Sequence, residues 1–153
     1  MPNKLNPLFT TPTMDFYTVS TETLAELPYI EGGISAGFPS PAADFLDATI
    51  DLNKHLIKNP STTFIAIAKG VSMKNIGIHD GDLLILDKSL EPKNGAIAAC
   101  VIDGEFTLKT LMVKAKEVYL TPENEDYKPI KITEFNDFKI WAILTHSIKA
   151  HKH

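Results

Sequence analysis

Ser72 and Lys109 are the residues of this sequence whose types and surroundings could supply a nucleophile and its general base. Ser72 lies in a loop, residues 69–82, that joins two predicted strands. Gly70 allows this loop to turn tightly, so the serine hydroxyl can be presented beside backbone N–H groups able to hold an oxyanion. A serine in such a loop is also typical of an ordinary turn, and the loop alone leaves both interpretations open.

Lys109 lies in a predicted strand whose alternation puts it on the same face as Thr107 and Leu111. If that face is buried, the cost of desolvating a cation lowers the lysine pKa. The resulting neutral amine can take the proton of a serine hydroxyl. An exposed, solvated lysine is the alternative, because lysine is rarely buried.

The single cysteine, Cys100, and the five histidines are the other candidates for nucleophilic or metal chemistry. Cys100 lies in the apolar run 96–102 without electropositive neighbours, which is typical of a buried structural thiol. No histidine has the CxxC or HExxH companions of a metal site. We therefore expect neither a metal nor a cofactor.

The elements that must position these groups are mostly strands. From residue 62 onward the chain alternates between β-branched or apolar runs and turn signals such as Asp80-Gly81, Asn94-Gly95 and Asp103-Gly104. The strongest local signal is a hairpin around Asp103-Gly104. The pattern predicts a compact, mostly β fold with strands at 63–68, 83–86, 96–102, 106–113, 118–120 and 138–148.

The first 36 residues differ from the rest. They hold four prolines and scattered apolar residues without a sustained period, which indicates an extended, loosely docked and accessible arm; a disordered tail is the alternative. A helical turn at 24–27 would end at Pro28. The arm ends in the glycine-rich stretch 32–39, which has the backbone freedom to thread into an active site.

A short helix is predicted after the arm. Ser40-Pro41 is typical of an N-cap followed by proline at the first helical position, with Phe45, Leu46 and Ile50 on the apolar side. A second helical turn at 52–57 would stop at Asn59-Pro60.

Length and charge narrow the class of protein. A chain of 153 residues fits one compact domain, 37–153, with an appendage, 1–36. The net charge is −4 and all fifteen basic residues are lysines, which argues against direct DNA binding because guanidinium groups are the usual readers of guanine. Biased base composition of the gene is another cause of missing arginine. No apolar stretch reaches the length of a membrane span and no signal peptide is evident, so we expect a cytoplasmic protein.

Three motifs, in order, resemble the UmuD and LexA proteins. Residues 70–85 resemble their nucleophile loop, and residues 103–111 resemble their lysine-bearing hairpin with the matching separation of 37 positions between Ser72 and Lys109. Residues 37–44 resemble the stretch that follows the cleavage point of UmuD, and Ile50-Asp51-Leu52-Asn53 continues the match. The likeness covers roughly residues 30–150.

The resemblance implies roles for individual residues. It makes Ser72 the nucleophile, Lys109 the general base, and the Ala36–Gly37 bond the site of self-cleavage. The backbone N–H groups of Ser72 and Met73 would hold the oxyanion. The sequence departs from UmuD in Val71, where UmuD commonly carries an acidic residue, and in a longer arm.

The family fold is a small, highly curved β structure that pairs as a homodimer, with the N-terminal arm across the body. The resemblance implies cleavage on contact with an activated recombinase filament on single-stranded DNA, after DNA damage. The shortened chain would then serve a Y-family translesion polymerase as an accessory subunit.

Three other functions are compatible with parts of the pattern. A LexA-like regulator would need a DNA-binding domain, which 36 proline-interrupted residues cannot supply. A catalytically idle polymerase-binding module would not need both Ser72 and Lys109. A signal-peptidase-like enzyme would be expected to carry a membrane segment.

Overall fold

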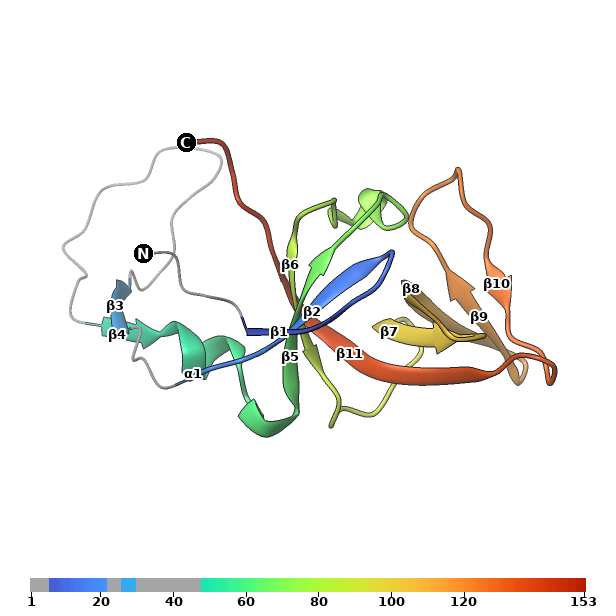
Figure 1. The fold of residues 1–153 in the computed structure, drawn as a ribbon, viewed down its shortest axis with the longest axis horizontal. Helices are drawn as coiled ribbons and strands as arrows, with labels where there is room; N and C mark the ends of the chain where they lie inside the picture. The colour runs from blue at the N-terminus through green and yellow to red at the C-terminus, as the bar shows by residue number, and fades with distance from the viewer. Residues whose placement is uncertain (1–5, 22–25, 30–47) are drawn as a thin grey trace. The chain divides into compact units, whose positions relative to one another are not determined.

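The computed structural model describes residues 6–21, 26–29 and 48–153, which form two compact units. The larger unit comprises residues 1–19 and 61–153, and the smaller one residues 20–60. Figure 1 shows a fold dominated by strands, as the sequence predicts. In the larger unit the strands are β1 (Asn6–Thr10), β2 (Met14–Thr18), β5 (Thr63–Ala68), β6 (Leu83–Asp87), β7 (Ile97–Ile102), β8 (Glu105–Lys114), β9 (Glu117–Thr121), β10 (Ile130–Lys131) and β11 (Phe138–Ile148).

These strands form one antiparallel sheet in the order β1-β2-β5-β6-β11-β7-β8-β9-β10. The six strands predicted from the sequence correspond to β5 to β9 and β11. The predicted hairpin is confirmed: β7 and β8 pair up to Ile102 and Glu105. Its turn places Asp103 at φ 49° and Gly104 at φ 84°, the two positive values that favour an Asp-Gly pair in a two-residue turn.

The sheet is strongly curved. Four strands separate β2 from β8 in the sheet order, yet the rings of Phe16 on β2 and Phe106 on β8 have centroids only 4.9 Å apart. The hydroxyl of Thr13, in the turn between β1 and β2, donates a hydrogen bond of 2.6 Å to the carbonyl oxygen of Phe106. The curvature encloses a core that includes Phe16, Leu84 and Leu108.

The interpretation of the N-terminus as a loosely docked arm is wrong for residues 6–18. These residues form the β1–β2 hairpin, and β2 pairs with β5 from Met14↔Ala68 to Thr18↔Phe64. Met14 and Phe16 are buried because alternate residues of β2 face the core. The alternation covers only a few residues, so it is not recognisable in the sequence among the surrounding threonines and prolines.

In the smaller unit, β3 (Glu26–Tyr29) pairs with β4 (Ala48–Asp51). Leu27 and Ile50 therefore lie opposite each other in strands, and the helical turns predicted to include them are wrong. A short helix, α1 (Leu52–Leu56), does follow, and the Asp51 carboxylate caps it by accepting from the Asn53 N–H. The predicted helix start at Ser40-Pro41, with Phe45 and Leu46, lies outside the described residues.

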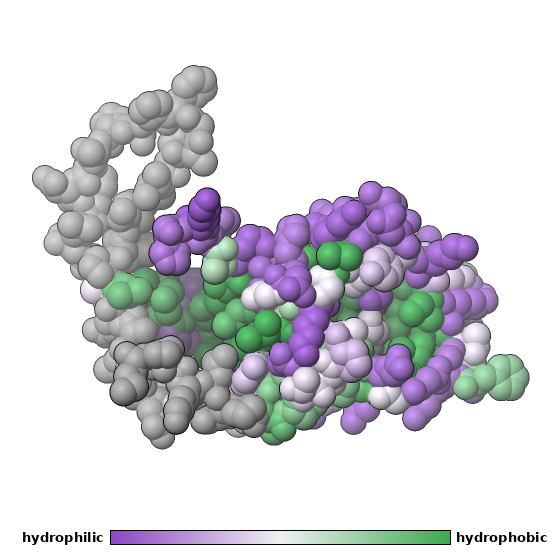
Figure 2. Space-filling view, turned by 45° about the horizontal axis from the view of Figure 1, so that its top comes forward, coloured by the Kyte–Doolittle hydropathy of each residue, from purple (hydrophilic) through white to green (hydrophobic). Residues whose placement is uncertain are grey.

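Two short 3-10 helices, η1 (Pro60–Thr62) and η2 (Lys74–Ile76), complete the elements of the described chain. In residues 6–21, 26–29 and 48–153, no helix has the length and apolarity to cross a membrane. Figure 2 shows a face on which hydrophilic side chains are interspersed with smaller apolar patches.

Candidate active site

The loop that carries Ser72 is tied at its base. After β5 ends at Ala68, the Ala68 N–H donates to the Asp82 carbonyl oxygen (2.9 Å) and the Gly81 N–H donates to that of Ala68 (2.8 Å). Gly70 adopts φ +89°, a conformation that L side chains rarely take, and its N–H donates to the Asp80 carboxylate at 2.9 Å. The tight turn predicted at Gly70 is therefore present.

A second segment holds the loop from the side. The Glu123 N–H donates to the Ser72 carbonyl oxygen (2.8 Å), and the Asn124 side-chain amide donates to that of Val71 (2.8 Å). The Asn124 residue is only 3% exposed. Sequence reasoning missed both residues, because the stretch after β9 carries only the signal of a turn.

Lys109 is buried, at 7% exposure, on the strand face predicted for it. Its Nζ atom lies 3.1 Å from the Ser72 Oγ, 2.7 Å from the Thr107 Oγ1 and 3.1 Å from the Leu108 carbonyl oxygen. The predicted loop and hairpin thus bring the serine hydroxyl and the lysine amine into hydrogen-bond contact. Thr107, predicted only as a neighbour on the same face, contacts the same amine.

Burial lowers the pKa of the Lys109 amine below the ordinary value of 10.5, because the charged form loses its hydration; the nearby Cys100 thiol acts weakly in the opposite direction. Among the ion pairs of the described residues, none involves Lys109. Burial without a counter-ion disfavours the charged form of a lysine, so the neutral amine is more favoured here than in a solvated lysine.

Cys100 is fully buried and free. Burial raises the pKa of its thiol to about 12, so the thiolate does not form near neutral pH. The prediction of a structural rather than a nucleophilic thiol agrees with this environment.

The backbone around Ser72 leaves donors available for an oxyanion. Lys74, Ile76 and Ile78 donate their N–H groups within the loop, to the carbonyl oxygens of Val71 and Met73. Within the described parts of the chain, the N–H groups of Ser72 and Met73 themselves have no hydrogen-bond acceptor.

A pocket opens beside Ser72, and the N-terminal hairpin forms part of its wall. Thr13 and Met14 line it, opposite residues of the Ser72 loop and of β8. Sequence reasoning missed these two wall residues because it assigned them to an accessible arm. The remaining lining residues are Ala68, Lys69, Gly70, Ser72, Met73, Ile78, Thr107 and Leu108.

Among the described residues, the ring of His79, one of the five histidines, is not a hydrogen-bond partner of Ser72 or Lys109. His79 contacts the Gly77 carbonyl oxygen (3.1 Å) and the Lys149 amine (2.9 Å) rather than Ser72. Ala36 and Gly37 lie outside the described residues, so the bond between them stays a prediction.

The chain is similar in sequence to a known family and to several known proteins. A family model described as Peptidase S24-like matches residues 28–145, which include both Ser72 and Lys109. The protein SamA of Salmonella typhimurium is 40% identical over 115 residues, 75% of this chain and 81% of SamA. The protein MucA of Escherichia coli is 34% identical over 137 residues, 89% of this chain and 93% of MucA. A LexA repressor of Shewanella denitrificans is 40% identical over 106 residues, 69% of this chain and 51% of the repressor.

Proposed function

Because the chain belongs to the peptidase S24-like family, as its resemblance to UmuD and LexA proteins predicted, we propose that it cleaves itself with a dyad of Ser72 as nucleophile and Lys109 as general base. The observation that carries this proposal is the 3.1 Å contact between the Lys109 Nζ and the Ser72 Oγ, made by a buried lysine whose pKa is lowered.

The contacts of the Lys109 amine suit the role of base. A neutral amine has two N–H groups and one lone pair. Its N–H groups can donate to the Leu108 carbonyl oxygen and to the Thr107 hydroxyl, which leaves the lone pair to accept the proton of the Ser72 hydroxyl.

The reaction that follows is acyl transfer. The Ser72 Oγ attacks the Ala36 carbonyl carbon as Lys109 takes the hydroxyl proton, and the oxyanion accepts hydrogen bonds from the N–H groups of Ser72 and Met73. The C–N bond breaks as Lys109 passes the proton to the Gly37 nitrogen, which leaves an ester between Ala36 and Ser72. Water, deprotonated by Lys109, then hydrolyses the ester to give the Ala36 carboxylate and free Ser72.

In the cell, this places the chain among the UmuD-like proteins of the SOS response. We propose that an activated recombinase filament on single-stranded DNA stimulates the cut, which divides residues 1–36 from residues 37–153. The product, a homodimer in the cytoplasm, serves a Y-family translesion polymerase as an accessory subunit. The chain spans most of MucA and SamA but about half of the LexA repressor, which favours this function over a LexA-like regulator.

The proposal is tested by incubating the purified chain with an activated recombinase filament and measuring fragment masses. We expect two fragments, residues 1–36 and residues 37–153. A different new terminus would reject the Ala36–Gly37 bond, and an uncut chain beside a cleaved MucA control would reject self-cleavage.

The Ser72→Ala chain is the matched control. It should stay intact under the same conditions and unfold within about 1 kcal/mol of the parent, because one hydroxyl is lost from a loop. Cleavage of the alanine variant at the same bond would assign the reaction to another nucleophile. Such a result would favour a catalytically idle Ser72.

A further inference from the structure

The β1–β2 hairpin supplies part of the core of the larger unit. Phe16 and Met14 are its largest fully buried side chains, at 0% and 1% exposure. They belong to the same cluster as Ala66 and Ala68 of β5 and Leu84 of β6. This core is incomplete without residues that precede the proposed cleavage site.

The strand β2 is internal to the sheet. Its five residues pair with β5 on one side, and β1 covers its other side. Figure 1 shows the two strands of the hairpin beside β5, and both belong to the sheet. Departure of the hairpin would turn β5 into an edge with unpaired backbone groups, a known hazard for aggregation.

Aromatic packing joins the hairpin to strands farther along the sheet. The ring centroid of Phe16 lies 4.4 Å from that of Phe9, 4.9 Å from that of Phe106 and 4.9 Å from that of Trp141. Such aromatic pairs stabilise the fold by more than the burial of their apolar surface area alone. The hairpin therefore contacts β8 and β11 as well as β5.

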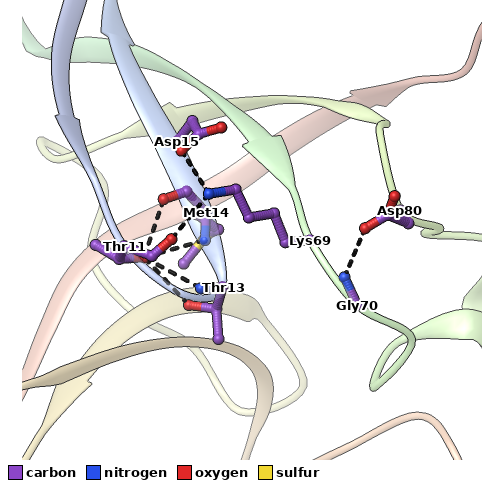
Figure 3. A network of polar contacts seen from close by, with 7 residues as sticks. All are labelled: Thr11, Thr13, Met14, Asp15, Lys69, Gly70 and Asp80. Carbon is purple, nitrogen blue, oxygen red and sulfur yellow. Dashed lines mark hydrogen bonds and ion pairs between the residues drawn. The ribbon is translucent and has the colours of Figure 1, made fainter.

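Polar contacts hold the turn of the hairpin in place (Figure 3). The Lys69 N–H donates to the Thr13 carbonyl oxygen at 2.9 Å, and the Lys69 amine pairs with the Asp15 carboxylate at 2.7 Å and donates to the Thr11 carbonyl oxygen at 3.1 Å. On the opposite side, the Thr13 hydroxyl bonds the Phe106 carbonyl oxygen. None of these contacts depends on the bond between residues 36 and 37.

We propose, resting on the self-cleavage proposed above, that the N-terminal fragment stays bound after the cut. Hydrolysis of one peptide bond removes none of the strand pairing, ring packing or ion pairing of residues 6–18. The product is then a noncovalent complex of residues 1–36 with residues 37–153. Its Ser72 pocket keeps the wall formed by Thr13 and Met14.

The test cuts the full chain with an added protease, so it does not depend on Ser72. In a Ser72→Ala chain, residues 35–37 are replaced by the recognition sequence of a sequence-specific protease, flanked by glycine–serine spacers that expose it. After complete cutting, gel filtration in native buffer separates complex from free peptide, and denaturing mass spectrometry identifies the fragments in each peak. Both fragments in one peak, at equal amounts, are expected. A free N-terminal fragment beside a folded body would overturn the proposal, whether or not the natural chain cleaves itself.

Two variants of the same chain test the cause of retention. Phe16→Ala should release the fragment after cutting, whereas Leu8→Ala, on the exposed side of β1 at 46% exposure, should keep it bound. Circular dichroism of each uncut chain checks that the fold is intact before the cut. Release of the fragment from Leu8→Ala as readily as from Phe16→Ala would overturn the assignment to core packing.

Discussion

Lys109 is unusual among lysines because it is buried without an acidic partner in the described chain. It is almost fully buried, yet its amine contacts only a carbonyl oxygen and two hydroxyl oxygens, with no carboxylate among its hydrogen-bond partners in the described chain. Protonating this amine would create an interior charge without a counter-ion, which is costly. The same environment that disfavours the charge suits the amine to the role of base that we propose for it.

The pH dependence of self-cleavage should report this amine. Because burial lowers the pKa of Lys109 below 10.5, its neutral fraction grows with pH in a range below that of a free lysine. We expect the first-order rate of unstimulated loss of intact chain to rise through the alkaline range until Lys109 is neutral or the fold fails.

Two variants test whether Lys109 is the base in this reaction. Lys109→Ala should hold the rate near zero at every pH, and His79→Ala should leave the profile almost unchanged, because His79 contacts Gly77 and Lys149 instead of the dyad. A rate that levels off near the histidine pKa of about 6.5, or one that survives loss of Lys109, would show that another group is the base.

The same titration should affect stability. Between the lowered pKa of folded Lys109 and the unfolded value near 10.5, the unfolded chain binds a proton that the folded chain lacks. The free energy of unfolding therefore rises with pH in that window, by at most about 1.4 kcal/mol per pH unit from this group. Lys109→Met should lose this rise.

Urea unfolding at several pH values, in Ser72→Ala chains with and without Lys109→Met, measures the difference. The free energy of unfolding of the Ser72→Ala chain, relative to that of the chain that also carries Lys109→Met, should increase from neutral pH toward pH 10. The hydrogen bonds that the Ser72→Ala change removes are missing from both chains, so they do not contribute to this pH dependence. Parallel stability curves would mean that folded Lys109 keeps its ordinary pKa.

At the scale of elements, Thr13 connects the two halves of the candidate site. Its carbonyl oxygen accepts from the Lys69 N–H, three residues before Ser72, and its hydroxyl donates to Phe106, three residues before Lys109. The turn between β1 and β2 thus fixes the Ser72 loop against β8. We infer that Thr13 is a positioning residue.

Replacing this hydroxyl should slow self-cleavage more than it destabilises the fold. One hydrogen bond of about 1 kcal/mol, if it acts on the spacing of the dyad, corresponds to a rate lower by roughly fivefold in Thr13→Val. Thr13→Ser should restore the rate, because serine keeps the donor.

The control is Thr145→Val. The Thr145 hydroxyl donates to the Ile85 carbonyl oxygen at 3.2 Å, in the pairing of β11 with β6 and away from the dyad. This variant should lower the thermal midpoint as much as Thr13→Val while leaving the cleavage rate unchanged. Equal loss of rate in both would reduce Thr13 to a structural role.

The net charge of the whole molecule bears on the choice between a UmuD-like protein and a DNA-binding, LexA-like regulator. The chain carries a net charge of −4 and no arginine, a balance that disfavours binding to nucleic-acid phosphates without sequence preference. We expect no mobility shift of duplex DNA at physiological ionic strength, even with Ser72→Ala chains that cannot cleave. Salt-sensitive binding to a defined duplex would instead favour a LexA-like regulator.

The sequence predicted those parts of the fold that local signals determine. The Asp-Gly turn at 103–104 and the apolar runs of β5 and β11 identify their strands without reference to partners, because turn chemistry and alternation are local properties. Ser72 and Lys109 were assigned their predicted roles because the segment around each resembles a motif of the UmuD and LexA proteins, whereas the local pattern alone left both open to structural interpretations.

The parts that were missed depend on partners distant in sequence. Met14 and Phe16 are only two apolar residues at a spacing of two, and they become a core strand because β5 and the aromatic rings of β8 and β11 receive them. Ile50 likewise lies in a strand because it pairs with Leu27, which is distant in sequence, whereas the predicted helix would have been formed with its neighbours in sequence. Such tertiary effects override local preference.

Trp141 gives the N-terminal hairpin an intrinsic optical probe. It is the only tryptophan in the chain, and its ring lies 4.9 Å from that of Phe16 and 6.2 Å from that of Phe9, both on the hairpin. A hairpin that leaves would open this indole to water and move its emission to longer wavelengths. Fluorescence excited at the indole band can therefore follow the hairpin in real time, in the unlabelled protein, through cleavage and through binding of any partner.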